Sequence, residues 1–181
     1  GENEIVSITT SRLSPEKGLD MVIDAFERCA SEIPQCRLYI AGGGRLRESI
    51  ETHARMKKSA DRITFPGYKE TVVDYLRMSD IFILGSSLEG LSNAMLEAMA
   101  TGLVVVSVDT PGSREAIDDG VNGFIVERTA EGLYRGLTAA SLLTREKRKQ
   151  IGNAARTTVQ QRFDVRNGIK KALALLELDR D

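Results

Sequence analysis

The sequence predicts an α/β protein with a Rossmann-like, doubly wound parallel sheet of about six strands. Short segments rich in β-branched and apolar residues alternate along the chain with helical segments of crossover length. Two strand segments, 81–84 and 104–106, are apolar at every position, as strands buried on both faces require. Polar or glycine-rich turns follow the strands, at the edge where such sheets bind ligands.

The first half of the chain contains three strand–helix units. Residues 4–10 are β-branched and apolar and form the first expected strand, and residues 15–31 carry apolar side chains at helical spacing. Residues 36–41 form the second strand, which three glycines end, and residues 45–59 form a helix with one polar face. Residues 62–65 form a short third strand that Pro66 and Gly67 close.

The second half repeats the alternation and ends in helices. We expect strands over 80–84, 103–108 and 122–126. The expected helices are 69–78, 93–100, 113–118, 130–143, 145–163 and 165–178. The sequence contains no internal repeat or linker, so we expect one domain over residues 1–181. It begins at Gly1 rather than Met, and we expect it to be part of a longer protein.

Composition excludes several classes of function. The net charge is −1, the chain has no Trp and aromatic residues make up 5%, which argues against a partner nucleic acid. Cys29 and Cys36 form no metal pattern, and we expect buried free thiols in a reducing compartment. His53 lies in a polar helical segment and is interpreted as a solvated side chain. The sequence has no signal peptide or membrane span, so we expect a cytoplasmic protein, with membrane association only through a part of the protein outside this sequence.

The side chains and backbone amides in the turns after the strands suit a nucleotide sugar as the ligand. Arg12 and Lys17 follow the first strand, and three glycines with free backbone amides follow the second. Glu89 and Glu97 flank a helix start after the fourth strand. Cations and backbone amides suit a diphosphate, and carboxylates suit the hydroxyl groups of ribose and sugar.

Each feature also has a purely structural interpretation. The glycines 42–44 do not match the dinucleotide fingerprint and could form only a tight turn. Arg12 and Lys17 could be solvated loop charges, and Glu97 could lie on an exposed helix face. Glu89 could complement the helix dipole, an effect of about 0.3–1 kcal/mol. The conjunction of these features favours a ligand site.

The same residues resemble a known family, the retaining glycosyltransferases of GT-B architecture, in their C-terminal, donor-binding domain. The resemblance covers residues 5–126 in order. Its motifs are S-R-L-S-P-E-K-G-L-D (11–20), L-Y-I-A-G-G-G-R-L-R-E (38–48), I-T-F-P-G-Y (63–68), S-S-L-E-G-L-S-N-A-M-L-E-A-M-A-T-G (86–102) and P-G-S-R-E-A-I-D-D-G-V-N-G-F-I-V (111–126). The fold implied is one half of a GT-B enzyme.

The resemblance implies a role for each matching residue. Arg12 and Lys17 match the basic pair that binds the donor diphosphate, and Glu89 matches the glutamate that faces the transferred sugar. These three are the expected catalytic residues. Glu97 matches the glutamate that binds the ribose hydroxyls. The remaining expected donor-binding residues are Gly43 near the phosphates, Gly67, Tyr68 and Lys69 at the base, and Gly90, Leu91, Ser92 and Asn93 at the helix start.

The resemblance also implies partners and a missing part. The donor is expected to be a nucleotide-diphosphate sugar, with UDP-sugar favoured and no metal or other cofactor required. The acceptor is expected to be a carbohydrate or a lipid-linked molecule, bound by an N-terminal domain for which 181 residues leave no room. We therefore expect the chain to bind donor weakly and to transfer nothing alone. The alternatives are a non-catalytic nucleotide-binding module and a nucleotide-sugar epimerase on the same fold; a dehydrogenase would need a glycine fingerprint after the first strand.

Overall fold

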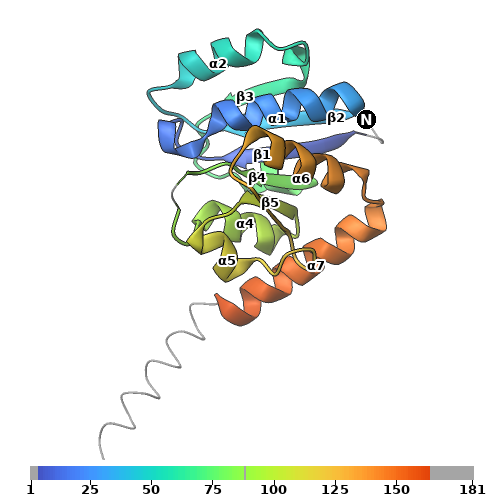
Figure 1. Ribbon diagram of the computed structural model, residues 1–181. Helices are drawn as coiled ribbons and strands as arrows, with labels where there is room; N and C mark the ends of the chain where they lie inside the picture. The colour runs from blue at the N-terminus through green and yellow to red at the C-terminus, as the bar shows by residue number, and fades with distance from the viewer. Residues whose placement is uncertain (1–3, 88, 164–181) are drawn as a thin grey trace, which may run out of the picture.

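A six-stranded parallel sheet forms the centre of the molecule in the computed structural model, which describes residues 4–87 and 89–163 (Figure 1). The strands are β1 (Ile5–Thr10), β2 (Cys36–Ala41), β3 (Ile63–Gly67), β4 (Ile81–Leu84), β5 (Val104–Val108) and β6 (Phe124–Val126). They are arranged in the order β3-β2-β1-β4-β5-β6, and every neighbouring pair is parallel. The predicted doubly wound fold and its strands are confirmed.

Helices cover both faces of this sheet. They are α1 (Leu19–Glu32), α2 (Arg47–Arg55), α3 (Val73–Arg77), α4 (Asn93–Thr101), α5 (Pro111–Ala116), α6 (Ala130–Leu142) and α7 (Arg145–Arg162), with short 3-10 turns η1 (Pro15–Lys17) and η2 (Ala60–Arg62). One buried cluster joins α1, α2 and α6 to the sheet, and a second joins α3, α4 and α5 to the opposite face, while α7 contributes to both. Along β4, Ile81 and Ile83 face the first cluster and Phe82 faces the second, which explains why this strand is apolar throughout.

Several helices differ in extent from the predicted ranges. The segment predicted as a helix over 69–78 contains only α3, because the β-branched run Thr71-Val72-Val73 disfavours an earlier helical turn. The predicted helix 15–31 is divided at Gly18, which ends η1 and begins α1. The helix predicted over 45–59 is limited to α2, and η2 follows it. The predicted helix 165–178 lies outside the described residues.

The helix predicted over 113–118 begins two residues earlier than expected. Pro111 occupies its first turn, where a missing amide hydrogen costs nothing. Thr110 caps the helix and forms a reciprocal capping box with Ser113.

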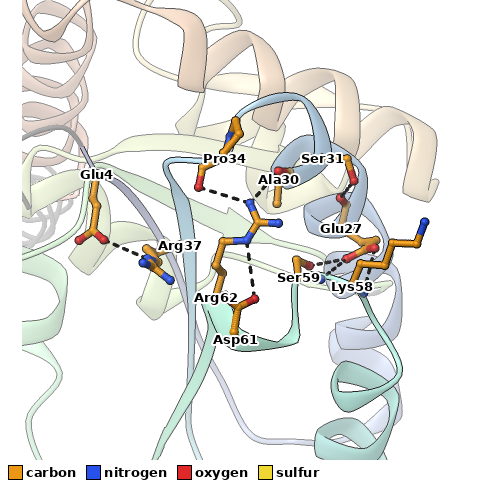
Figure 2. A network of polar contacts seen from close by, with 10 residues as sticks. All are labelled: Glu4, Glu27, Ala30, Ser31, Pro34, Arg37, Lys58, Ser59, Asp61 and Arg62. Carbon is orange, nitrogen blue, oxygen red and sulfur yellow. Dashed lines mark hydrogen bonds and ion pairs between the residues drawn. The ribbon is translucent and has the colours of Figure 1, made fainter.

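A polar network fixes α1 against the segment that leads into β3 (Figure 2). The Glu27 carboxylate accepts hydrogen bonds from the backbone amides of Lys58 and Ser59, at 3.1 and 3.0 Å, and from the Ser59 hydroxyl. The Arg62 guanidinium donates to the carbonyl of Ala30 at 2.7 Å and to that of Pro34. These contacts satisfy the polar groups at the end of α1 and hold the edge strand β3 in place.

The two cysteines lie in the interior, as predicted. Cys29 on α1 and Cys36 at the start of β2 are fully buried free thiols whose sulfur atoms are 3.9 Å apart.

Candidate functional site

The strand order reverses direction between β1 and β4, and this point fixes where a ligand can bind. The chain builds β2 and β3 on one side of β1, and β4, β5 and β6 on the other. In parallel sheets of this kind, ligands bind at the carboxyl ends of the strands beside such a reversal. The loops that leave β1 and β4 there comprise residues 11–18 and, among the described residues, 85–87 and 89–92.

Close backbone contact joins the two loops. Gly18 has φ 60°, and a Cβ atom there would lie 2.3 Å from the carbonyl oxygen of Gly85. Only glycine fits both the left-handed backbone and this approach. The amide of Ser87 donates to the carbonyl of Glu16 at 2.7 Å and ties the same loops a second time.

This contact brings two of the predicted catalytic residues together. Lys17 Nζ donates to Glu89 Oε2 at 2.7 Å, across 72 positions of sequence. The side chains are 21% and 18% exposed, so the ion pair is largely withdrawn from water but remains partly accessible to solvent. Neither charge is a freely solvated loop charge, which removes the structural interpretation given above for Lys17.

The start of α4 follows Glu89 directly. Ser92 caps the helix by accepting a hydrogen bond from the amide of Met95, and Asn93 is its first residue, as predicted. Gly90, Leu91 and Asn93 are exposed, whereas Ser92 is buried. The first-turn amides of a helix lack internal partners and favour an anion, so this end of α4 suits a phosphate group.

A cavity of about 390 Å³ lies on the other side of β1. Its lining includes the predicted residues Arg12, Gly43, Tyr68 and Lys69 and Gly42 of the predicted glycine turn, together with residues not predicted as site residues: Thr10, Ser11, Ala41 and Val72. Arg12 is exposed, and Tyr68 is 77% exposed at the rim.

Hydrogen bonds between the loops after β1 and β2 build this cavity. The amide of Ser11 donates to Ala41 at 3.1 Å, and the amide of Leu13 donates to Gly43 at 2.9 Å. A Cβ atom on Gly42 would lie 1.8 Å from the carbonyl oxygen of Ser11. The glycine run therefore does more than turn the chain, because it lets the β2 loop lie directly against the segment that carries Arg12. Gly67 is buried and its carbonyl accepts from the amide of Gly42.

Unpartnered hydroxyls mark the missed part of the cavity. Within residues 4–87 and 89–163, the buried hydroxyl oxygens of Thr10 and Ser11 have no hydrogen-bond partner. A buried hydroxyl without a partner costs free energy, which a polar ligand in the cavity would recover. In the sequence, these two residues could have been recognised as site residues by their position at the end of β1, where Thr10 lies two residues and Ser11 one residue before Arg12.

Glu97 does not share this cavity. It is exposed on α4 and lines a separate hollow of about 370 Å³ with Val73, Leu76, Arg77, Ala100, Thr101 and Arg156. Val72 lines the first cavity and Val73 lines the second, so the two hollows lie on either side of the start of α3. Glu97 therefore lies on an exposed face of α4, as its structural interpretation above describes.

A further basic residue reaches the loop after β4 from the end of β6. Arg128 donates from its guanidinium to the carbonyl of Ser87 at 2.5 Å. Like Arg12, it follows a strand by two residues, and this spacing was the available signal. On the loop after β1, the Ser14 hydroxyl holds the pKa of the exposed Glu16 carboxyl below its ordinary value.

His53 lies apart from these loops. It is half-buried on α2, where its Nε2 is 2.8 Å from Asp24 Oδ1, so the expected solvated side chain is in fact held by a carboxylate. Within the described ranges 4–87 and 89–163, no group of three or more His, Cys, Asp or Glu side chains could hold a metal ion. In the same ranges, no helix combines the length and the apolar character needed to cross a bilayer.

The sequence model of the family described as "Glycosyl transferases group 1" matches residues 1–158 of the 181. The chain belongs to this family. Among its relatives, the lipopolysaccharide core biosynthesis glycosyltransferase LpsE of Rhizobium meliloti is 31% identical over 133 residues, which cover 73% of this chain and 38% of LpsE. A GDP-mannose-dependent alpha-(1-6)-phosphatidylinositol monomannoside mannosyltransferase of Mycobacterium tuberculosis is 29% identical, covering 91% of this chain and 45% of that protein.

Solved structures share the fold of this chain. The crystal structure of Anabaena HepE in complex with UDP and glucose superimposes with a TM-score of 0.86 at 25% identity, covering 97% of this chain and 48% of HepE. The chain spans only 25–45% of the length of three further curated relatives. The expected Rossmann-like α/β fold, shared with GT-B glycosyltransferases, is confirmed.

Proposed function

We propose that this chain is the donor-binding domain of a retaining glycosyltransferase. The whole enzyme moves a sugar from a nucleotide-diphosphate sugar to a glycan or a lipid-linked acceptor, which an N-terminal domain outside this sequence binds. The observation that carries the proposal is the Lys17–Glu89 ion pair, which joins a phosphate-binding cation to a sugar-facing carboxylate at the strand-order reversal of the sheet.

Each part of the donor has a matching group. Arg12 and Lys17 bind the diphosphate, together with the amides at the start of α4. Glu89 orients the transferred sugar. Residues 67–69 bind the base through the cavity that Tyr68 and Lys69 line. The ribose role of Glu97 requires the nucleotide to pass the start of α3, since Glu97 lines the hollow beyond Val73.

The chemistry follows from the charges. Transfer leaves a nucleoside diphosphate with developing negative charge and a sugar with developing positive charge. Arg12, Lys17 and the start of α4 stabilise the first without a metal, and Glu89 favours the second. Preorganised donors act strongly in a crevice from which water is partly excluded, and losing one costs about 3–4 kcal/mol of barrier.

The relatives favour two candidate bases. HepE, at 25% identity, is described in complex with UDP, and the mycobacterial relative, at 29% identity, is described as GDP-mannose-dependent. We favour a UDP-sugar, and GDP is the first competitor to test.

The test is calorimetric titration of the chain with UDP, GDP and ADP, with and without magnesium, repeated on Glu97→Ala. We expect one nucleotide to bind without metal and to bind more weakly to the variant. Binding that requires magnesium would contradict the metal-independent site, and binding unaffected by Glu97→Ala would contradict the ribose role.

A second assay separates a donor domain from the alternative functions. The chain alone, mixed with donor and acceptor, should transfer no sugar, whereas the whole enzyme should. Enzyme-like turnover by the chain alone would refute the requirement for a second domain. Conversion of the sugar nucleotide to its epimer would favour the epimerase instead.

A further inference from the structure

The start of α5 packs directly behind the loop that carries Glu89, and the proposed function gives it no role. A Cβ atom on Gly112 would lie 1.9 Å from the carbonyl oxygen of Gly90, 2.4 Å from its carbonyl carbon and 2.9 Å from the amide nitrogen of Leu91. All three are backbone atoms, so no side-chain rotation could make room. Any side chain at position 112 has to displace residues 90–91.

Contact, and not backbone conformation, demands a glycine at this position. Gly112 is buried and is not among the glycines with positive φ. Alanine would suit its helical backbone, since alanine is the best helix former. A change to alanine therefore tests the approach to Gly90 and nothing else.

The surface that Gly112 presents is itself held firmly. The amide of Ser113 donates to Thr110 Oγ1 at 3.1 Å, and the amide of Thr110 donates to Ser113 Oγ at 2.8 Å. Ser113 Oγ also contacts the carbonyl of Val108, the last residue of β5, at 3.1 Å. These groups are buried, so the start of α5 is anchored to the central sheet.

On the side where a Gly90 side chain would point, the space is open. Gly90 is exposed, and a Cβ atom built there would meet nothing within 4 Å. Among the described residues, the start of α5 is thus the surface that the backbone of Gly90 contacts. Gly90 lies one residue after Glu89 and three residues before the first residue of α4.

We propose that Gly112 is a positioning residue for the donor site. By fixing the backbone of Gly90 and Leu91, it sets where the Glu89 carboxylate and the amides of α4 stand relative to Lys17. The proposal rests on the proposed function for its consequence in donor binding. The effect of Gly112 on the backbone of Gly90 and Leu91 does not depend on a ligand.

The test is Gly112→Ala against a matched control, Gly152→Ala. A Cβ atom on Gly152 would lie 1.9 Å from the carbonyl oxygen of Gly102, so the control creates the same steric conflict between α7 and the far end of α4. Both variants should lower the melting temperature. Only Gly112→Ala should speed amide hydrogen exchange over residues 85–95 in the ligand-free chain, and only it should weaken UDP or GDP binding, by about tenfold or more.

Ser113→Ala provides a second variant in case Gly112→Ala does not fold. It adds no atoms but removes the capping box, and Thr144→Ala removes the cap of α7 as its control. Ser113→Ala should show the same changes at smaller size. The positioning role is refuted if exchange over residues 85–95 is unchanged in both site variants, or if the control variants alter it equally.

The two proposals can fail separately. If the unaltered chain binds no nucleotide, the proposed function fails. Hydrogen exchange over residues 85–95 still tests the positioning role in that case. If nucleotides bind equally to the unaltered chain and to Gly112→Ala, the donor domain stands and the positioning role falls.

Discussion

The Lys17–Glu89 ion pair predicts that Glu89→Gln strengthens the binding of a nucleoside diphosphate. In the ligand-free chain, the Lys17 ammonium is already held by a carboxylate at 2.7 Å. A diphosphate therefore has to replace Glu89 as the partner of Lys17 and must approach a second negative charge. UDP and GDP lack the transferred sugar, so the amide variant loses none of the contacts expected of Glu89.

The size of the gain follows from the distance and the burial. At 2.7 Å and an effective dielectric constant of about 20, the Coulomb attraction is about 6 kcal/mol before the costs of desolvation and ordering. Fully exposed pairs retain about 0.2–1 kcal/mol of this, and breaking a buried pair costs about 3–5 kcal/mol. Side chains that are 21% and 18% exposed lie between these cases. We expect about 1–2 kcal/mol, or about fivefold to thirtyfold tighter binding.

The assay is calorimetry with UDP and GDP on the unaltered chain, Glu89→Gln, Lys17→Met and the double variant. Lys17→Met should weaken binding, and in the double variant the benefit of Glu89→Gln should shrink to what charge repulsion alone provides. Glu115→Gln, on an exposed position of α5, removes the same charge elsewhere and should have little effect. If Glu89→Gln binds no more tightly than the unaltered chain, the two ligands do not compete for Lys17 and the reasoning is wrong.

Three other predictions concern the site and the scaffold. Arg12→Ala in the whole enzyme should lower kcat/KM by about 10²–10³-fold, measured by donor turnover, while the exposed position leaves the melting temperature unchanged. Glu27→Gln should lower the free energy of unfolding by about 1–2 kcal/mol in urea titrations at pH 7, with Glu48→Gln as the exposed control. Burial acts to raise the pKa of Glu27, but hydrogen bonds to its carboxylate hold the pKa below the ordinary value of 4.5. The contribution of Glu27 to the free energy of unfolding is therefore complete above pH 4.5. The difference in stability between the variant and the unaltered chain should vanish as pH falls through the folded-state pKa. Cys29 and Cys36 should react with a thiol reagent only after unfolding, since both side chains are fully buried and no reagent can reach their sulfur atoms in the folded chain.

The strands could be predicted from the sequence because each is a short apolar run with a turn signal after it. Residues 81–84 show this most clearly, since a strand buried on both faces has no other pattern available. The helix before it was harder to predict. Residues 69–72 have a helical mixture of polar and apolar positions, yet they precede α3, because the β-branched side chains of Thr71 and Val72 disfavour a helix there. Lys69 and Val72 line the cavity instead.

The sequence predicts which loops lie close together at the site, but it does not predict which residues of these loops are in contact. The rule that parallel strands end at one edge brings the loops after β1 and β4 together. It does not say that Gly18 meets Gly85 in backbone contact, which is what brings Lys17 to Glu89. The contact between Gly112 and Gly90 was equally invisible, because a glycine needed for close approach looks in sequence like a glycine needed for a turn.

The separation of Glu97 has a different origin. Glu97 is the fifth residue of α4 and lies on an exposed face beside α3, whereas Glu89 precedes the helix, and the sequence does not predict how α3 separates the two hollows. A donor whose base lies in the first cavity and whose ribose reaches Glu97 must therefore bridge the two hollows across Val72 and Val73.

Charge neutralisation by the Lys17–Glu89 pair links donor binding to the proposed chemistry. While Lys17 is paired with Glu89, the cation and the anion cancel each other. Under the proposed function, Lys17 would turn to the diphosphate, and Glu89 would become a free carboxylate beside the transferred sugar, where positive charge develops. One exchange of partners would thus prepare both ends of the bond that breaks. The same exchange predicts weak binding by this chain alone, because the free energy gained at the diphosphate is reduced by the ion pair that is lost.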